Sequence, residues 1–553
     1  MVKLTSFFFA KNLRKQLNFR TVFVGLLALA FVSPILAIIY TATGDTGGLW
    51  PHLAQTVLPR YLKNTLVLLF GVSLVSLLFG VTTAWIVMRY EFVGRSLLQW
   101  MLLLPAAIPG YLIAYTYTDF FEYAGPVQIL LRDYFGWSSA REYWFPEIRS
   151  MGGAILVLGA VLYPYVYVLA RTAFTLTPAS LFEVARLSGQ SLFWRVAIPL
   201  ARPSIGAGLA LVMMETLSDF GTVEYFAIET ISLGIFNVWL GMNSLTAAAQ
   251  ISLLAFLFII GLPILELFAR SRRRFIDTTQ RSAPLAAINV KGPGAIFCCF
   301  ICLVPIVIGF AVPVVVLLRF IVQGHSLEID SAMISAAKNT VFLGLSAAFL
   351  VIFVASILGM TAAFDKSRWM KVLAALTSFG YAFPGTILAI GVVTAGGALD
   401  ENISYVLGSI AGISYDGWLT SGVGLVLCAC VIRFQAVGYG AVSTGLQRVS
   451  PHIAEASRVL GCGLMQSMRR VMLPSISLSC VAGALLVFVD VMKELPMTLI
   501  LRPFNYETLA TIVYQYAKDE LLEEAALPAL AIVLCGLIPI ILLNKALNRI
   551  RRS

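Results

Sequence analysis

Charged side chains are scarce in this chain, and their scarcity excludes most classes of soluble protein. Of the 553 residues, only 12% are Asp, Glu, Lys or Arg, whereas 59% are hydrophobic. Soluble domains carry about 25% charged residues, and they need polar side chains to cover their surface. A chain this poor in charge cannot form a water-soluble globule, so the sequence predicts a protein that is embedded in a bilayer.

Signatures of catalysis and metal binding are also missing. The sequence contains no HExxH motif, no GxSxG motif and no phosphate-binding GxxxxGK[ST] loop, so neither an intramembrane enzyme nor ATP hydrolysis by this chain is indicated. Its three histidines are too scattered to form a metal cluster. Cys299 and Cys302 have metal-like spacing, but they lie in an apolar run without a second pair, so we expect packing thiols. We expect no cofactor bound by this chain.

A disulfide framework is not indicated either. All eight cysteines fall in apolar runs or in segments that we expect on the cytoplasmic side, and none falls in a loop that we expect on the external side. Proteins that are stabilised by disulfides need their cysteines in an oxidising compartment. We therefore expect helix packing in the bilayer, rather than covalent crosslinks, to hold the fold together.

Long apolar runs dominate what is present. A helix needs about 20 mainly apolar residues to cross the hydrocarbon core. The basic stretch before the first run ends in no convincing cleavage site, so this run should be an uncleaved span. The sequence thus predicts an all-α integral membrane protein with about 12 transmembrane helices. They are expected at about 21–43, 61–88, 97–118, 150–172, 204–226, 245–269, 295–321, 338–363, 372–394, 419–442, 475–500 and 525–546.

Basic residues are distributed unevenly between the two sides of these spans. With the N-terminus inside, most Lys and Arg fall in cytoplasmic segments, and acids concentrate outside, as in the segment from Asp519 to Glu524. The positive-inside rule then predicts that both termini are cytoplasmic. This distribution accounts for most of the net charge of +11. No nucleic-acid partner is needed to explain it.

The sequence repeats itself at a fixed interval. We therefore expect two homologous halves, 1–290 and 291–553, each with six spans. An even number of spans gives both halves the same orientation, so a pseudo-two-fold axis should run along the membrane normal, with a transport pathway between the halves. Three matches share the offset of 275 residues: Lys63-Asn64-Thr65 with Lys338-Asn339-Thr340, Pro109-Gly110 with Pro384-Gly385, and Pro199 with Pro474.

Each half has one long cytoplasmic loop, at about 177–203 and 449–474. Each loop has an acidic residue at the start of a short helical pattern, a glycine six residues later, and then a basic, apolar segment that leads to a proline at the next span. This pattern predicts a short helix, a glycine turn and a second short helix, which together can fit a groove on a soluble partner. The repeated positions are Glu183 and Glu455, Gly189 and Gly461, and Pro199 and Pro474.

The loop pattern resembles the signature of permeases in binding-protein-dependent ABC importers, and the resemblance covers nearly the whole chain. In that family the loop docks into a cleft of the ATPase subunit as the coupling helix. The resemblance implies a transport subunit of the bacterial inner membrane, two copies of a separate ATPase that uses ATP and Mg²⁺, and a substrate-binding protein on the outer face. The ATPase-coupling residues that it implies are Glu183, Ala185, Gly189, Pro199, Glu455, Ala456, Gly461 and Pro474.

Three further stretches are similar to the fused two-domain permeases of ferric-iron importers. They are Ile108-Pro109-Gly110-Tyr111, Tyr163-Pro164-Tyr165-Val166-Tyr167 and residues 214–226. The resemblance implies ferric iron as the substrate. Importers of the same class for polyamines, thiamine or phosphonates stay open, and so does a secondary transporter driven by an ion gradient. That transporter would explain charges inside the membrane but not two matched loops.

The two loops differ in length and in the residues after the acid. Gly461 and Pro474 are 13 positions apart, whereas Gly189 and Pro199 are 10 apart. Three residues are nearly one helical turn, so we expect the first coupling helix to be shorter or re-angled. The second positions are Val184 in the first loop and Ala456 in the second. The docking surfaces are therefore expected to differ.

Four acids occupy equivalent places in the fifth and eleventh spans: Glu215, Asp219, Asp490 and Glu494. Charged side chains in a bilayer are costly and usually face a cavity or a partner. Spaced four residues apart, each pair should share one helical face, and all four could converge on a central pathway. Their hard oxygen ligands suit a hard cation bound transiently, and would serve a polyamine nearly as well. Alternatively, the acids are hydrated near the outer ends, or paired with residues such as Lys493 and Arg502.

Overall fold

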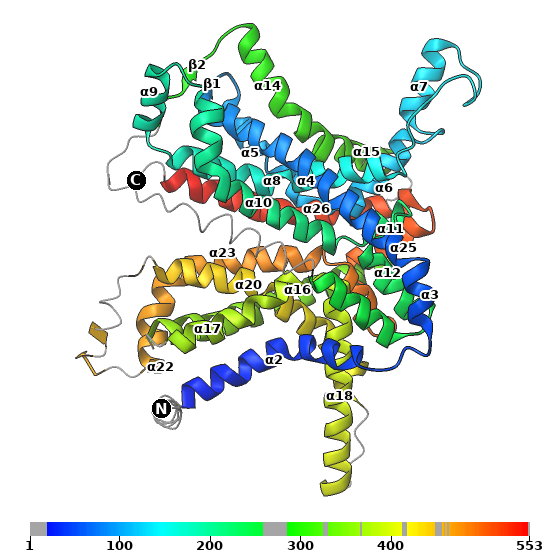
Figure 1. The fold of residues 1–553 in the computed structure, drawn as a ribbon, viewed down its shortest axis with the longest axis vertical. Helices are drawn as coiled ribbons and strands as arrows, with labels where there is room; N and C mark the ends of the chain where they lie inside the picture. The colour runs from blue at the N-terminus through cyan, green and yellow to red at the C-terminus, as the bar shows by residue number, and fades with distance from the viewer. Residues whose placement is uncertain are drawn as a thin grey trace. The chain divides into compact units, whose positions relative to one another are not determined.

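The computed structural model describes residues 19–257, 285–323, 330–364, 368–411, 417–447, 449, 456–457, 459–461 and 464–550. In these ranges the chain is almost entirely helical, as the sequence predicts (Figure 1). One short parallel pair of strands, β1 (Tyr90–Glu91) with β2 (Ile288–Asn289), is the exception within the described residues. The all-α class follows from the bilayer, since only helices satisfy every backbone polar group within one segment.

Two compact units divide the chain, and neither is a contiguous half. Unit 1 consists of Met1–Gly44 and Ser335–Thr508, and unit 2 of Asp45–Ile334 and Leu509–Ser553. The first predicted span therefore packs with helices of the second sequence half. These units are defined by packing, whereas the predicted halves, 1–290 and 291–553, are defined by the sequence repeat. The boundary between the halves stays a prediction.

Unit 2 is organised around the long pair α4 (Leu58–Arg89) and α8 (Met151–Leu176). Close approach of the two backbones is possible because glycine faces the partner: a Cβ on Gly80 would lie 2.7 Å from the Cβ of Val166. The other elements of this unit are α3 (Leu49–Gln55), α5 (Arg95–Met101), η1 (Leu104–Ala107), α6 (Gly110–Phe121), α7 (Pro126–Phe135), α9 (Ala179–Leu187), η2 (Phe193–Ala197), α10 (Ile198–Ser218), α11 (Gly221–Tyr225), α12 (Ile231–Phe236), η3 (Asn237–Gly241), the helix Leu245–Leu257, α14 (Pro293–Ile306), η4 (Val307–Ala311), α15 (Val312–Val322), α25 (Leu509–Lys518) and α26 (Leu522–Ile550).

Unit 1 packs α2 (Phe19–Ala42) against helices of the second half, as Figure 1 shows. Val24 of α2 is fully buried in a cluster with Leu358, Met370 and Ala374. Further along, Gly391 allows its helix to approach the backbone of Pro34. The other elements are α16 (Ser331–Phe364), α17 (Arg368–Leu376), η5 (Thr377–Ala382), α18 (Gly385–Ala411), α19 (Trp418–Ser421), α20 (Gly424–Gln447), α22 (Leu464–Ser467), η6 (Met468–Met472), α23 (Leu473–Met492) and α24 (Pro496–Leu501).

Nine helices of the described ranges are long and apolar enough to cross a membrane, or ten if one bent pair counts as a span. The bent pair corresponds to the expected span 97–118, which breaks before Gly110 with a bend of 95°. The expected span 372–394 breaks likewise, between η5 and α18. Both expected spans are wrong as single helices, because a proline, Pro109 or Pro384, lies in each break and disfavours helix at the residue before it. The expected span 245–269 lies partly outside the described residues.

The repeated Lys-Asn-Thr motif makes the same contact in both units. The side-chain amide of Asn64 donates to the carbonyl oxygen of Glu229 at 3.0 Å, and that of Asn339 donates to the carbonyl oxygen of Glu507 at 2.9 Å. Each asparagine thus ties a long helix, α4 or α16, to the segment after the fifth or eleventh span. The sequence repeat therefore corresponds to a repeat of local structure.

Candidate functional site

The first of the two predicted cytoplasmic loops contains α9, which carries the predicted coupling residues Glu183 and Ala185. Glu183 is exposed on it, whereas Phe182 and Ala185 are buried on its inner face. The helix begins at Ala179, directly after Pro178, so Glu183 lies in its middle. The expectation that the acid starts the helix is wrong, because Pro178 provides an earlier start with its fixed backbone angle.

Gly189 ends α9 in the way that the sequence pattern predicts. Its φ is +65°, in the left-handed region that favours glycine. The amide of Gly189 donates to the carbonyl oxygen of Arg186 at 3.1 Å, and the amide of Gln190 donates to that of Ala185 at 2.9 Å. These two bonds form a Schellman motif, which satisfies the last carbonyl groups of the helix. Gly189 therefore sets the direction in which the chain leaves α9.

An aromatic cluster fixes α9 to the spans. The ring of Trp85 on α4 lies 6.3 Å from Phe182 of α9, 5.2 Å from Phe193 of η2 and 5.7 Å from Phe174 of α8, measured between ring centroids. Aromatic pairs at such distances stabilise beyond their buried area. One indole on α4 therefore contacts α8, α9 and η2 at the same time.

The predicted second short helix does not exist as a separate element. Residues Phe193–Ala197 form a π-helical turn that continues into α10, and Met468–Met472 form the same turn before α23. Pro199 and Pro474 lie in the first turn of α10 and α23, as predicted. A proline is tolerated there because its missing N–H is not needed. Each loop is thus joined to its span without a flexible break.

The second loop is described only in part, and Glu455 lies outside the described residues. Ala456 is exposed, whereas Ser457 is buried with its hydroxyl oxygen 2.7 Å from that of Ser467. Gly461 has a φ of +79°, like its counterpart in the first loop. The glycine turn is therefore common to both loops.

Methionines take the place of the aromatic cluster in the second half. Met360, Met468 and Met472 are buried together. Met360 and Met468 stand 275 positions after Trp85 and Phe193. Methionine side chains are flexible and adapt to irregular gaps. The contact between loop and span is therefore softer in the second half than in the first.

Both loops also expose large apolar side chains. Val184 is 62% exposed and Leu187 is 89% exposed, while Val459 and Leu460 are 88% and 81% exposed. Exposed apolar groups that gather on one short element are typical of surfaces that contact another protein. As far as the structure describes the two loops, their exposed apolar side chains lie on α9 and on residues 459–461.

The four acids that were predicted to line a pathway are divided by helix breaks. α10 ends at Ser218 and α23 ends at Met492, so the expectation that each pair of acids shares one helical face is wrong. Asp219 has an extended backbone with ψ of 130°. The apolar pattern continues across each break, which is why the sequence suggested single spans at 204–226 and 475–500. Glu215 and Asp490 stay on the helices, and Asp219 and Glu494 lie beyond them.

Asp219 caps the short helix that follows it. Its carboxylate accepts a hydrogen bond from the hydroxyl of Thr222 at 2.9 Å and one from the amide of Val223 at 3.2 Å. Gly110, at the start of α6, lies against this site: a Cβ there would be 2.9 Å from the Thr222 hydroxyl and 3.0 Å from Leu158. The Pro109-Gly110 motif therefore allows close packing on the helix break.

Glu494 occupies the equivalent break and has a different neighbour. It accepts a hydrogen bond from the amide of Met497 at 3.1 Å, at the start of α24. It also pairs with Arg433 of α20 at 3.4 Å, and both side chains are over 90% buried. Gly385, the repeat of Gly110, allows this arginine to approach, since a Cβ would clash with its guanidinium. In the first half, the position of Arg433 is taken by Leu158.

The other acids have their own surroundings. Lys493 pairs with Asp490 at 2.9 Å, so the alternative interpretation of a local ion pair is met there. Arg502 pairs instead with Glu507. Within the part of the chain that the structure describes, no three His, Cys, Asp or Glu side chains are grouped to hold a metal ion. A transient cation site at Glu215, Asp219, Asp490 and Glu494 stays a prediction.

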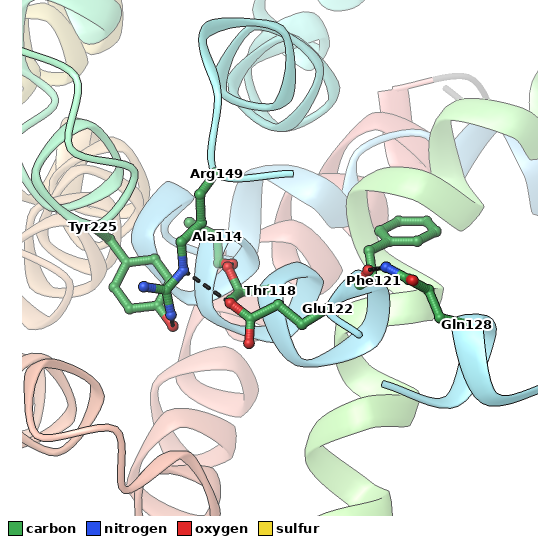
Figure 2. Close-up of polar contacts among 7 residues, drawn as sticks. All are labelled: Ala114, Thr118, Phe121, Glu122, Gln128, Arg149 and Tyr225. Carbon is green, nitrogen blue, oxygen red and sulfur yellow. Dashed lines mark hydrogen bonds and ion pairs between the residues drawn. The ribbon is translucent and has the colours of Figure 1, made fainter. Parts of the chain in front are cut away.

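Residues 122–150 follow α6 in unit 2 and contain α7; we call this segment the hairpin. The sequence did not predict it. Figure 2 shows Arg149 between Glu122, at the end of α6, and the ring of Tyr225 on α11. Arg149 pairs with Glu122 at 3.0 Å, and its guanidinium lies 4.9 Å from the centroid of Tyr225. The amide of Gln128 donates to the carbonyl oxygen of Phe121 at 2.7 Å. Arg149 therefore connects this hairpin to the helix that Asp219 caps.

An open pocket of about 660 Å³ lies against the hairpin. Its lining includes Glu122, Gln128, Tyr143 and Arg149. Nearby, the hydroxyl and amide of Ser138 donate to the exposed carboxylate of Glu142 and lower its pKa. The sequence offered no motif for this element, because its contacts join residues that no periodic pattern relates.

Comparisons with known proteins agree with the duplicated plan. The family model of the binding-protein-dependent transport system inner membrane component matches twice, at residues 76–274 and 355–552. The two matched segments fall in the two predicted halves. They include the π-helical turns η2 and η6 and the four acids Glu215, Asp219, Asp490 and Glu494.

Relatives differ in what their names say they transport. The chain is 24% identical to the Fe(3+)-transport system permease protein FbpB 2 of Haemophilus influenzae, over 95% of this chain and 97% of that protein. It is 28% identical to the sulfate transport system permease protein CysW of Escherichia coli, over 42% of this chain and 82% of that protein. The molybdenum transport system permease protein ModB of Escherichia coli is 29% identical over 31% of this chain and 71% of its own length.

A bacterial alginate ABC transporter, in complex with a periplasmic protein that holds an alginate pentasaccharide, is among the solved structures that the chain resembles. It is 15% identical, covers 46% of this chain and 96% of its own, and superimposes with a TM-score of 0.35. The two family matches, rather than this superposition, decide the assignment. The chain belongs to the family of binding-protein-dependent transport system inner membrane components, as a fused permease that carries the family domain twice.

Proposed function

We propose that this chain is the membrane permease of an ATP-driven importer for ferric iron. A binding protein would deliver the iron to the outer face, and two ATPase subunits would bind the loops that contain Glu183 and Glu455. Both termini would lie in the cytoplasm. The chain itself would bind no cofactor, and ATP and Mg²⁺ would be used by the ATPase subunits.

The packing of the first loop is the main structural support for the proposed coupling to the ATPase. α9 exposes Val184 and Leu187, while its inner face is fixed through Phe182 to Trp85. The π-helical turn after Gly189 continues into α10 without a break. A groove that holds the exposed face would therefore move the spans as a rigid body when the ATPases close.

The choice of iron is supported by the relative that aligns along almost the whole chain, the Fe(3+) permease of Haemophilus influenzae. The sulfate and molybdenum permeases align with less than half of it. Glu215 and Asp219 add carboxylate oxygens near a helix break, and such ligands suit a hard cation better than an oxyanion. Polyamines, thiamine and phosphonates are the other candidates for a permease of this class.

Docking of the binding protein is assigned to the hairpin around α7. Its side chains Tyr134 and Trp144 are 80% and 85% exposed. Arg132 holds the base of the hairpin together by donating to the carbonyl oxygen of Tyr123 at 2.7 Å. Rigid exposed aromatic groups are typical of protein interfaces. A partner bound here would be connected through Arg149 to α11 and to the acid that caps it.

The test is uptake by proteoliposomes that contain this chain with its ATPase and binding protein. Radiolabelled ferric iron, sulfate, molybdate and spermidine would be supplied separately, with ATP inside or omitted. The proposal expects ATP-dependent accumulation of iron and of no other compound. Accumulation of sulfate or molybdate instead would keep the importer class and reject iron. Iron uptake that follows an ion gradient without ATP would indicate a secondary transporter.

A further inference from the structure

An apolar groove runs along unit 1 beside the second loop. Its volume is about 1190 Å³. Its walls come from α2, α16, η6 and α23. The side chains that define it are Phe23, Phe349, Phe353, Met360, Met468 and Val481. Several of these side chains are strongly exposed, for example Phe349 at 68% and Val481 at 57%.

The groove lies at one end of the spans that form it. It uses the beginning of α2, the last part of α16 and the beginning of α23, which meet at the same membrane face because α16 runs antiparallel to the other two. Figure 1 shows the start of α2 near α17 and α22, at one end of the unit. All three lining helices are candidate membrane spans. The groove therefore opens to the lipid, at the face that the proposed orientation makes cytoplasmic.

Two substitutions between the halves create the groove. Where unit 2 has the bulky Trp85 and Phe193 in contact, the second half has the slimmer Met360 and Met468, and both line the groove. At the mouth, Arg469 stands where the first loop has Trp194. Compared with the first half, the second half therefore has smaller side chains and an additional positive charge at this place.

The mouth of the groove is polar, whereas its walls are apolar. Arg469 and Gln466 line it at the end next to the loop, and both are exposed. This arrangement matches an amphipathic molecule that has an acyl chain and an anionic headgroup. Basic pockets between spans on the cytoplasmic side are where anionic headgroups bind. A soluble protein segment would not explain why the groove faces the hydrocarbon.

We propose that this groove binds one anionic glycerophospholipid of the inner leaflet, with an acyl chain along Phe349 and Phe353 and the phosphate at Arg469. The assignment of the leaflet rests on the proposed orientation. The bound chain would pack against η6, the π-helical turn that joins the second loop to α23. The lipid would then supply the side-chain volume that Trp85 and Phe193 supply in the first half.

The test measures lipid that stays bound to the purified full chain. The protein would be equilibrated with equal amounts of phosphatidylglycerol and phosphatidylcholine in mixed micelles, and retained lipid would be counted by native mass spectrometry. Wild type should retain phosphatidylglycerol about fivefold over phosphatidylcholine. Arg469→Ala should bring this ratio close to one, because it removes the headgroup charge and leaves the walls intact.

Two further variants separate the groove from general charge effects. Met360→Trp with Met468→Phe rebuilds the aromatic filling of the first half, and should reduce retention of both lipids. Arg195→Ala removes an exposed arginine from the matching turn of the first loop, and should behave like wild type. Retention unchanged in the filled variant, or no retained lipid in wild type, would overturn the proposal. Because neither ATP nor substrate enters the measurement, its result is independent of whether iron is transported.

Discussion

Two helix breaks at equivalent positions hold an acid in different ways. Asp219 is held by hydrogen bonds from Thr222 and Val223. Glu494 is held by the amide of Met497 and by the buried guanidinium of Arg433. The backbone plan is the same, because both acids cap the helix that follows. The two halves therefore share the hydrogen bond between the acid and the following helix, but only the second half places a guanidinium next to the acid.

The two loops likewise share a backbone conformation but differ in the side chains that pack against the spans. Both have a glycine with positive φ and a π-helical turn that continues into a span. Trp85 anchors the first loop, and Met360 contributes to a methionine cluster in the second. We therefore expect the first loop to pass motion more stiffly than the second.

The largest effect is expected from breaking the buried ion pair. Arg433→Leu copies Leu158 of the first half and leaves Glu494 buried without its cation, which should cost about 3–5 kcal/mol of stability. Adding Glu494→Gln to it should restore most of that loss, because no buried charge then remains. Thermal unfolding in detergent, followed by size-exclusion chromatography, measures both. A double variant as unstable as the single one would contradict this reading of the pair.

Removing the aromatic anchor should have the next largest effect. Trp85→Ala deletes contacts to Phe174, Phe182 and Phe193, and should cost about 3 kcal/mol. Met360→Ala, at the equivalent position, should cost about 2 kcal/mol, because its softer neighbours can close part of the space. Limited proteolysis of the two loops, alongside thermal unfolding, would report where each variant loosens. Equal loosening of both loops in Trp85→Ala would remove the distinction between them.

A charge-only change at Asp219 should affect transport more than folding. Asn keeps a side-chain oxygen that can accept the hydrogen bond from the amide of Val223, so Asp219→Asn keeps the helix start while removing the charge. We expect ferric uptake to fall about tenfold, which corresponds to about 1.4 kcal/mol. Glu494→Gln should add to the defect, and it is combined with Arg433→Leu so that no guanidinium is left buried beside a neutral side chain. The combined variant should still bind the ATPase, and normal uptake by it would exclude a pathway role for these acids.

The smallest effect is expected at the loop glycines. Gly189→Ala places a side chain in open space, so only the left-handed backbone conformation opposes it, at a cost of about 1 kcal/mol. Gly461→Ala should cost the same, because its φ is in the same region. Protease protection of each loop is the appropriate measurement. Clearly unequal losses would mean that the two turns are not equivalent.

The all-α membrane class and the duplication could be predicted from the sequence. The helix breaks in the fifth and eleventh spans, and the side chains that surround them, could not. Long apolar runs and a constant offset of 275 residues pointed to helical spans in two copies. The breaks after Ser218 and Met492 were missed because apolar residues continue through them. The pairing of Arg433 with Glu494 could not be predicted either, since 61 residues separate them and no periodic pattern relates such positions. Contacts of this kind are decided by packing rather than by local sequence.

We propose that the two loops couple ATP hydrolysis to transport. To test this coupling, wild type is compared with the Glu183→Ala, Glu455→Ala double variant, in proteoliposomes with ATPase, binding protein and radiolabelled ferric iron. Uptake and ATP hydrolysis would be measured in the same samples at equal permease content. We expect the double variant to lose uptake, while hydrolysis persists at a rate that the loaded binding protein no longer stimulates. Uptake at the wild-type rate, with hydrolysis still stimulated, would show that the loops do not couple the two processes.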